Sequence, residues 1–117
     1  MSGAVSYHAG LRAEEQVSAN YARRGYRPCA RRWRGRGGEI DLIARDGDGY
    51  VFVEVKRARD FARAAERVSL RQLRRISAAA AEFLGRAKAG LDTPARIDVA
   101  LVNGTGQIEI IENAFGH

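Results

Sequence analysis

Apolar residues recur at helical spacing in two stretches of the chain. Over residues 9–24, Val17 and Tyr21 fall on one side of a helical wheel, and polar residues occupy the other side. Gly25 follows this stretch, and glycine is the usual residue just past the end of a helix. Over residues 69–84 the apolar positions again repeat at three and four. The sequence therefore predicts one helix in each stretch.

Elsewhere apolar and polar residues alternate, which is typical of β-strands. Residues 46–49 read Asp-Gly-Asp-Gly, and these glycines can supply the positive φ of a hairpin turn, so the strands on either side should pair antiparallel. A second turn, at residues 103–106, reverses the chain near its end. The predicted strands are residues 26–33, 39–44, 50–56, 96–102 and 107–111.

The resulting order of elements is α-β-β-β-α-β-β, with too few helices to alternate with every strand. Such an order predicts an α/β fold of three layers, in which a mixed central sheet of about five strands is flanked by helices on both faces. The 117 residues suffice for one hydrophobic core, so we expect a single domain over residues 1–117. Residues 1–8 precede the first helical pattern and are expected to form a flexible segment.

Basic residues outnumber acidic residues by 20 to 14, which gives a formal net charge of +6. All of the basic residues except Lys56 and Lys88 are arginines, whose guanidinium groups bind phosphate oxygens in bidentate geometry. Seven arginines lie within residues 22–38, where there is no acidic residue, and seven more lie within residues 57–75. A GC-rich genome also raises arginine content, but clustering favours a surface that binds nucleic acid.

Cysteine and histidine are scarce in this chain. Cys29 is the only cysteine, and His8 and His117 lie near the two ends, so neither a disulfide framework nor a Cys/His zinc site can be assembled. Any metal ion must therefore have oxygen ligands. The first residues lack the pattern of a signal peptide, and no apolar run approaches the roughly 18 residues of a membrane span. We expect a cytoplasmic protein without membrane contact.

Two carboxylates are expected to become neighbours across the predicted hairpin. Glu39 and Asp41 share one face of their strand, and Phe52, Glu54 and Lys56 share one face of the next. Because Asp41 and Glu54 would repel each other, a cation that takes oxygen ligands, Mg²⁺ or Mn²⁺, would stabilise the pair. Lys56 would then position and activate the attacking water. The alternative is a solvated strand face on which Glu54 and Lys56 form an ordinary ion pair.

Further polar residues have two interpretations each. Glu14 falls within the apolar sector of the first helix, where a carboxylate needs either an arginine or a metal ion as its partner. Gln72 is either the third residue of a capping box that begins at Ser69 or a hydrogen-bond donor in an active site, and the two roles are compatible. Asp98 shares a strand face with Arg96, which favours an ion pair over a catalytic role.

These residues stand in stretches that together resemble the YraN-like family of bacterial proteins, which by motif belongs to the PD-(D/E)xK nuclease superfamily. The resemblance covers about residues 10–115. It implies a restriction-endonuclease-like fold, metal ligation by Asp41 and Glu54, a water-positioning role for Lys56, and an acid near the metal at Glu14. The matching stretches are Gly10-x-x-Ala13-Glu14, Gly25-Tyr26, Gly37-Gly38-Glu39-Ile40-Asp41-Leu42-Ile43-Ala44, Val51-Phe52-Val53-Glu54-Val55-Lys56, Arg96-Ile97-Asp98-Val99 and Asn113-Ala114-Phe115.

Two positions depart from the pattern that the resemblance implies. The family usually has lysine where this chain has Gln72, and asparagine where it has Arg32. The Gln72 side chain can hydrogen bond but cannot stabilise negative charge as a lysine would. The resemblance therefore implies the fold more strongly than it implies an activity, because one fold serves many functions.

Together the motif and the arginine clusters favour a Mg²⁺-dependent nuclease-like enzyme that hydrolyses DNA phosphodiesters, in branched or damaged DNA. One alternative is a non-catalytic module that binds nucleic acid or docks a repair or recombination protein onto DNA. Another is a protein-interaction domain whose arginines bind an acidic partner. The sequence leaves open whether the protein forms a homodimer. The candidate catalytic residues are Glu14, Asp41, Glu54, Lys56 and Gln72, and the arginines expected to contact nucleic acid are Arg31, Arg32, Arg34, Arg36, Arg57 and Arg71.

Overall fold

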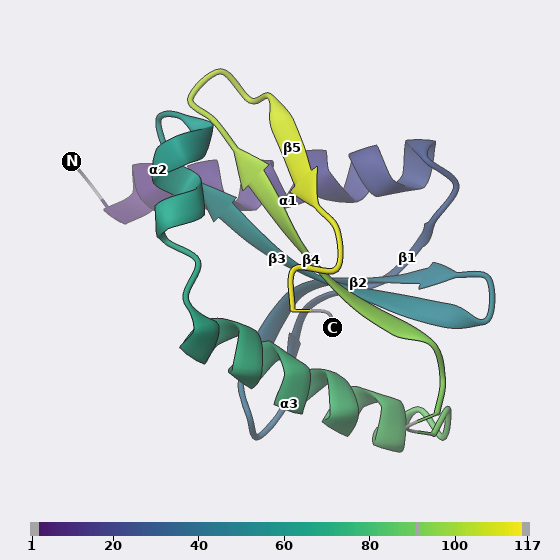
Figure 1. Cartoon of the computed structure of the whole chain (residues 1–117). Coiled ribbons are helices and arrows are strands. Elements are labelled where there is room, and N and C mark those ends of the chain that lie inside the picture. The colour runs from purple at the N-terminus through teal and green to yellow at the C-terminus, as the bar shows by residue number, and fades with distance from the viewer. Residues whose placement is uncertain (1–2, 91, 116–117) are drawn as a thin grey trace.

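The computed structural model describes residues 3–90 and 92–115, with side chains from His8 onward (Figure 1). The order of its elements agrees with the predicted α-β-β-β-α-β-β arrangement, apart from one additional short helix. The elements are α1 (Gly3–Arg23), β1 (Arg27–Arg34), β2 (Glu39–Asp46), β3 (Gly49–Arg57), α2 (Phe61–Glu66), α3 (Leu70–Arg86), β4 (Ala95–Val102) and β5 (Ile108–Ile111).

The strands form one mixed sheet of five strands in the order β1-β2-β3-β4-β5. β1 pairs with β2, β2 with β3, and β4 with β5 in antiparallel fashion. β3 and β4 are parallel, with Glu54 opposite Val99. A parallel pair needs a long crossover connection, which α2 and α3 supply. The predicted antiparallel pairing of the two hairpin strands and the mixed character of the sheet are both confirmed.

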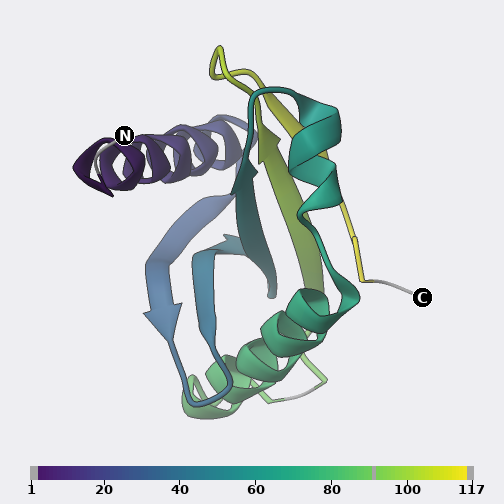
Figure 2. The same ribbon diagram turned by 90° about the vertical axis from the view of Figure 1, so that its left-hand side faces the viewer.

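Helices cover both faces of the sheet, so the predicted three-layer α/β architecture is confirmed. Figure 2 shows α1 on one side of the β3–β4 region and α2 with α3 on the other side. Val17 and Tyr21 of α1 are fully buried against Leu42 and Val53. The second cluster, between the sheet and α3, contains Ile40, Ile43, Phe52, Leu73, Ile76, Ala80, Leu84 and Val99.

Strict alternation along β2 is interrupted at its beginning. Ile40 and Ile43 both pack in the cluster beneath α3, whereas Leu42 packs in the cluster beneath α1. Strict alternation would place Ile40 and Leu42 together on the face opposite Glu39 and Asp41, and that expectation is wrong. The physical reason lies in the pairing, because β2 is bonded to β3 only from Leu42, opposite Val53, to the turn. The first residues of β2 diverge from β3 and twist out of the common register.

Two helical segments differ from the sequence prediction. α1 begins at Gly3, inside the segment 1–8 that was expected to be flexible, and Met1 and Ser2 lie outside the described residues. No proline precedes Pro28, and each residue added to an existing helix gains a hydrogen bond, so the helix extends. α2 was not predicted because it is short. Its N-cap is Asp60, whose carboxylate accepts from the Arg63 N–H at 2.8 Å.

The β2–β3 hairpin depends on one glycine for its turn. Gly47 has a φ of 59°, which suits the first position of a two-residue turn. Gly49 was also expected to supply positive φ, but it begins β3 and is buried, and a Cβ there would lie 2.7 Å from the Pro94 carbonyl oxygen. Across the described part of the chain, no helix has both the length and the apolar composition needed to cross a bilayer.

Candidate active site

A cavity of about 220 Å³ opens where β2 and β3 diverge. Asp41 and Glu54 project into it from the two strands, and α3 forms the opposite wall. The expected meeting of the two carboxylates across the hairpin is therefore present. The lining residues are Gly38, Glu39, Asp41, Glu54, Gln72, Arg75 and Ile76.

The carboxyl group of Asp41 is strongly perturbed by its surroundings. Burial raises the pKa of Asp41 to about 8, and a hydrogen bond and charge repulsion from Glu54 act in the same direction. The N–H of Val55 donates to Asp41 Oδ2 at 2.8 Å and works the other way, because it stabilises the carboxylate. At neutral pH and without a cation, Asp41 is therefore mostly protonated.

A hard divalent cation fits this pair of oxygen donors. Mg²⁺ needs only one or two carboxylates from the protein and keeps several waters, and its charge would replace the proton that Asp41 and Glu54 otherwise share. No group of three or more acidic, histidine or cysteine side chains is suitably placed for a metal in residues 3–90 and 92–115. Of the three predicted ligands, Asp41 and Glu54 line the cavity and Glu14 does not, so metal binding by the first two stays a prediction.

Lys56 and Gln72 lie beside the carboxylate pair. Lys56 Nζ is 3.7 Å from Glu54 Oε2, and both side chains are largely buried. With the Gln72 amide oriented to satisfy its neighbours, its oxygen accepts from Lys56 Nζ at 2.7 Å, and its nitrogen donates to the Arg67 carbonyl at 2.9 Å. The backbone N–H of Gln72 donates to Ser69 Oγ at 3.1 Å. Gln72 therefore combines a capping role for its backbone with a place for its side chain beside Lys56.

Glu14 has an arginine as its partner. Its carboxylate accepts from Arg32 Nε at 2.8 Å, its side chain is 11% exposed, and it does not line the cavity. The sequence left either an arginine or a metal ion as the partner of Glu14, and in the structure the partner is Arg32. Arg32 has a φ of 52°, a left-handed conformation that is uncommon for a residue other than glycine and that asparagine tolerates better. This backbone conformation accompanies the turn of the Arg32 side chain toward α1.

The arginines expected to contact nucleic acid are all exposed but differ in their partners. Arg34 pairs with Glu39 at 3.0 Å, and Arg32 pairs with Glu14. Within the described residues the guanidinium groups of the remaining four have no ion pair, which leaves them available to an anionic ligand. These four are Arg31, Arg36, Arg57 and Arg71.

One residue of the cavity wall was not predicted from sequence. Arg75 is exposed, faces the cavity from α3, and has no ion pair among the described side chains. It lies three residues after Gln72, so the two side chains share a face of the helix. The helical periodicity of residues 69–84 could therefore have predicted that Arg75 lies beside Gln72.

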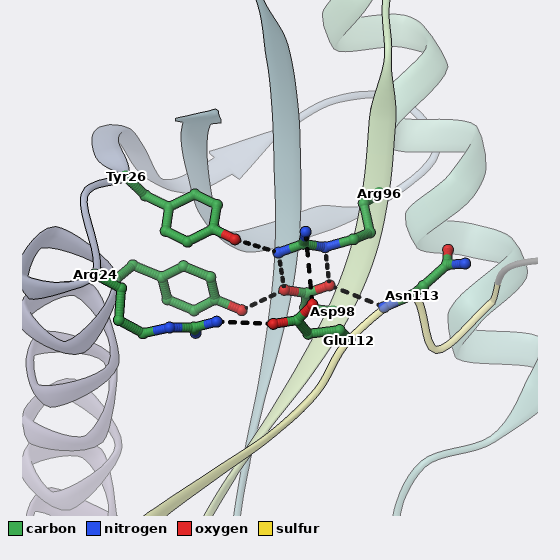
Figure 3. Close-up of polar contacts among 7 residues, drawn as sticks. Arg24, Tyr26, Arg96, Asp98, Glu112 and Asn113 are labelled. Carbon is green, nitrogen blue, oxygen red and sulfur yellow. Dashed lines mark hydrogen bonds and ion pairs between the residues drawn. The ribbon is translucent and has the colours of Figure 1, made fainter. Parts of the chain in front are cut away.

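A second polar cluster surrounds Asp98, on the face of the sheet covered by α1 (Figure 3). The Asp98 carboxylate is fully buried and accepts from Tyr21 Oη at 2.6 Å and from the Asn113 N–H at 3.0 Å. It also accepts from Arg96 Nε at 2.8 Å and from Arg96 Nη2 at 2.9 Å. The expected ion pair with Arg96 is thus confirmed, within a larger network that already satisfies both carboxylate oxygens.

Comparison with known proteins places the chain in a family. The model of the uncharacterised protein family UPF0102 matches residues 13–102. A UPF0102 protein of Ruegeria pomeroyi is 62% identical, covering 98% of this chain and 94% of its own length. One from Cereibacter sphaeroides is 56% identical, covering 98% of each chain, and one from Roseobacter denitrificans is 50% identical, covering 97% of this chain and 88% of its own. The resemblance to YraN-like proteins is therefore confirmed, and the chain belongs to the UPF0102 family.

Proposed function

We propose that this protein is a nuclease that hydrolyses DNA phosphodiester bonds with Mg²⁺ or Mn²⁺ as its cofactor. The observation that carries the proposal is the cavity in which the Asp41 and Glu54 carboxylates lie together beside Lys56. Holding two carboxylates in a partly buried site is costly without a cation, and the raised pKa of Asp41 reflects that cost. Such perturbed groups in a cavity are typical of functional sites.

Each residue has a distinct part in the proposed reaction. Asp41 and Glu54 hold the cation, which when bound would polarise a phosphoryl oxygen and stabilise the charge of the leaving oxygen. Lys56 positions the attacking water, and Gln72 fixes the Lys56 ammonium group through its carboxamide oxygen. Arg75, at the cavity wall and without an ion pair among the described residues, binds a non-bridging oxygen of the substrate phosphate.

The direct test compares matched variants on a panel of single-stranded, duplex, flap and four-way-junction DNA with Mg²⁺ or Mn²⁺. Asp41→Asn and Lys56→Ala should abolish cleavage, because both side chains act in the chemical step. Asp48→Asn, in the exposed hairpin turn, and Lys88→Ala, at the only other lysine, should cut as the wild type does. All variants are purified identically, so that a contaminating nuclease would appear in every preparation.

Binding measured in EDTA separates catalysis from recognition. Asp41→Asn and Lys56→Ala should bind DNA as the wild type does within about threefold, because most of the affinity comes from arginines outside the cavity. If no protein cuts any substrate, or if the wild type and both variants cut equally, the nuclease proposal is wrong. Salt-dependent DNA binding without cleavage would then support the non-catalytic binding module.

A further inference from the structure

A second cavity, of about 280 Å³, lies on the face of the sheet opposite α3. One wall is a face of α1 that includes Arg12 and Gln16, and the other is the turn between β4 and β5, at residues 102–106. Arg57, the last residue of β3, completes the rim. In Figure 1 the first half of α1 and the β4–β5 turn lie at the same end of the molecule. Among the side chains that the structure describes, no acidic one lines this cavity.

The wall formed by the β4–β5 turn is held in place by its own hydrogen bonds. Asn103 Oδ1 accepts from the backbone N–H groups of Thr105, at 3.1 Å, and Gln107, at 2.9 Å. The Gly104 N–H donates to the Arg59 carbonyl at 2.9 Å, which ties the turn to the segment that follows Arg57. The cavity therefore has its shape before any ligand enters, and a preformed site loses little entropy on binding.

The two arginines of this cavity have no counter-ion among the residues that the structure describes. Arg12 and Arg57 are exposed, and neither guanidinium group has an ion pair or hydrogen-bond partner among the described residues. Other arginines of this chain do have such a partner, for example Arg24 with Glu112 and Arg34 with Glu39. Two positive groups that border one cavity without an acid favour an anionic ligand.

We propose that this cavity binds a backbone phosphate of a nucleic-acid strand through Arg12 and Arg57. Arginine matches phosphate in bidentate geometry, and the Gln16 carboxamide adds a further donor beside the turn. Lys56 and Arg57 are consecutive on β3, so their side chains project to opposite faces of the sheet. The nucleic acid is thereby held on both faces at the end of β3. This inference requires nucleic-acid binding but does not require cleavage.

The test measures binding of a fluorescent single-stranded oligonucleotide in EDTA over a range of salt concentrations. Each lost phosphate contact should reduce the salt slope by about 0.7, which corresponds to about fivefold weaker binding at 0.1 M salt. Because Arg12 and Arg57 bind the same phosphate, Arg12→Gln/Arg57→Gln should reduce the slope by about 0.7. The control Arg23→Gln/Arg27→Gln removes the same charge from exposed positions outside the cavity and should change the slope much less.

A second measurement locates the ligand on the protein. Titration with inorganic phosphate, followed by NMR of the arginine side-chain N–H groups, should shift the signals of Arg12 and Arg57 before that of Arg23. Equal slopes in the two double variants, or phosphate shifts elsewhere only, would overturn the proposal. The proposal would also be overturned if Arg12→Gln/Arg57→Gln lost binding to a glutamate-rich peptide but still bound the oligonucleotide as the wild type does. That result would favour an acidic protein as the ligand. Cleavage by the wild type is measured in a separate assay. The nuclease proposal and the phosphate-binding proposal can therefore fail independently of each other.

Discussion

At the scale of residues, the surroundings of Asp41 change the protonation of its carboxyl group. The same side chain on an exposed strand would be ionised at neutral pH, but burial and the neighbouring Glu54 keep a proton on it. Competition between this proton and a divalent cation would make metal affinity increase with pH up to about 8. The perturbed pKa also makes the stability of the metal-free protein depend on pH.

In EDTA, the contribution of Asp41 to the free energy of unfolding should fall as the pH rises from about 4 to about 8. The folded-state pKa of Asp41, about 8, lies above the ordinary value of 3.8, so in this interval the folded state holds a proton that the unfolded chain has released. The Asp41 contribution to the slope cannot exceed about 1.4 kcal/mol per pH unit. Urea unfolding of wild type and Asp41→Asn at several pH values tests this. The variant should lose the Asp41 contribution, and parallel curves for the two proteins would contradict the assigned pKa.

At the scale of elements, the Asp98 cluster joins segments that are distant in sequence. Tyr21 comes from the end of α1, Arg96 and Asp98 from β4, and Asn113 from the segment after β5. Ala114 continues this attachment, since its N–H donates to the Ile97 carbonyl at 2.7 Å. Burial, together with the hydrogen bond to Asp98, raises the pKa of Tyr21, so its hydroxyl remains a donor at every physiological pH. The cluster holds α1 and the C-terminal segment on the sheet.

Removal of the Tyr21 hydroxyl should therefore destabilise the fold without affecting the candidate active site. Tyr21→Phe deletes a buried hydrogen bond to a carboxylate, and we expect a loss of about 1.5–3 kcal/mol in the free energy of unfolding. Tyr26→Phe is the matched control, because the Tyr26 hydroxyl accepts from Arg96 at 2.9 Å in a less buried position and should matter less. Denaturant unfolding measures both. An equal, small effect of the two substitutions would show that the cluster contributes little.

At the scale of the whole molecule, only some of the positively charged side chains are available to bind an anionic ligand. Several arginines are committed to carboxylates within the fold, including Arg24, Arg32, Arg34 and Arg96. Arginines without ion pairs in the described residues lie on β1, on α3 and at the end of β3, and two of them, Arg75 and Arg57, line the two cavities. Polyanion binding should therefore depend on particular positions more than on the net charge of +6.

Single substitutions on and beside β1 test this distinction. Arg31→Gln should lower the salt slope of duplex DNA binding by about 0.9, the amount expected for one lost phosphate contact. Arg34→Gln should lower it less, because Glu39 already neutralises part of that charge at 3.0 Å. Arg23→Gln, at the end of α1, serves as the control of equal charge. If all three substitutions changed the slope equally, the net charge and not the individual positions would govern binding.

The sequence alone determined the features that depend on neighbouring residues. Alternation and the Asp-Gly-Asp-Gly turn predicted the hairpin, and hence the meeting of Asp41 and Glu54. Helical spacing predicted α3, and Ser69 predicted its N-terminus. These signals are local, because strand periodicity, turn conformation and capping each involve a few consecutive residues. The family motif agreed with them, since the same positions carry both the pattern and the resemblance.

Only the tertiary structure decided which distant groups meet and how deeply they are buried. It provided Arg32 as the partner of Glu14, and it joined Tyr21 to Asp98 across 77 positions of the chain. Burial raised the pKa of Asp41, and the approach of α1 to the β4–β5 turn created the cavity beside Arg12. The sequence left these outcomes open because desolvation and long-range pairing arise when separate elements pack, and periodicity within one element does not specify its partners.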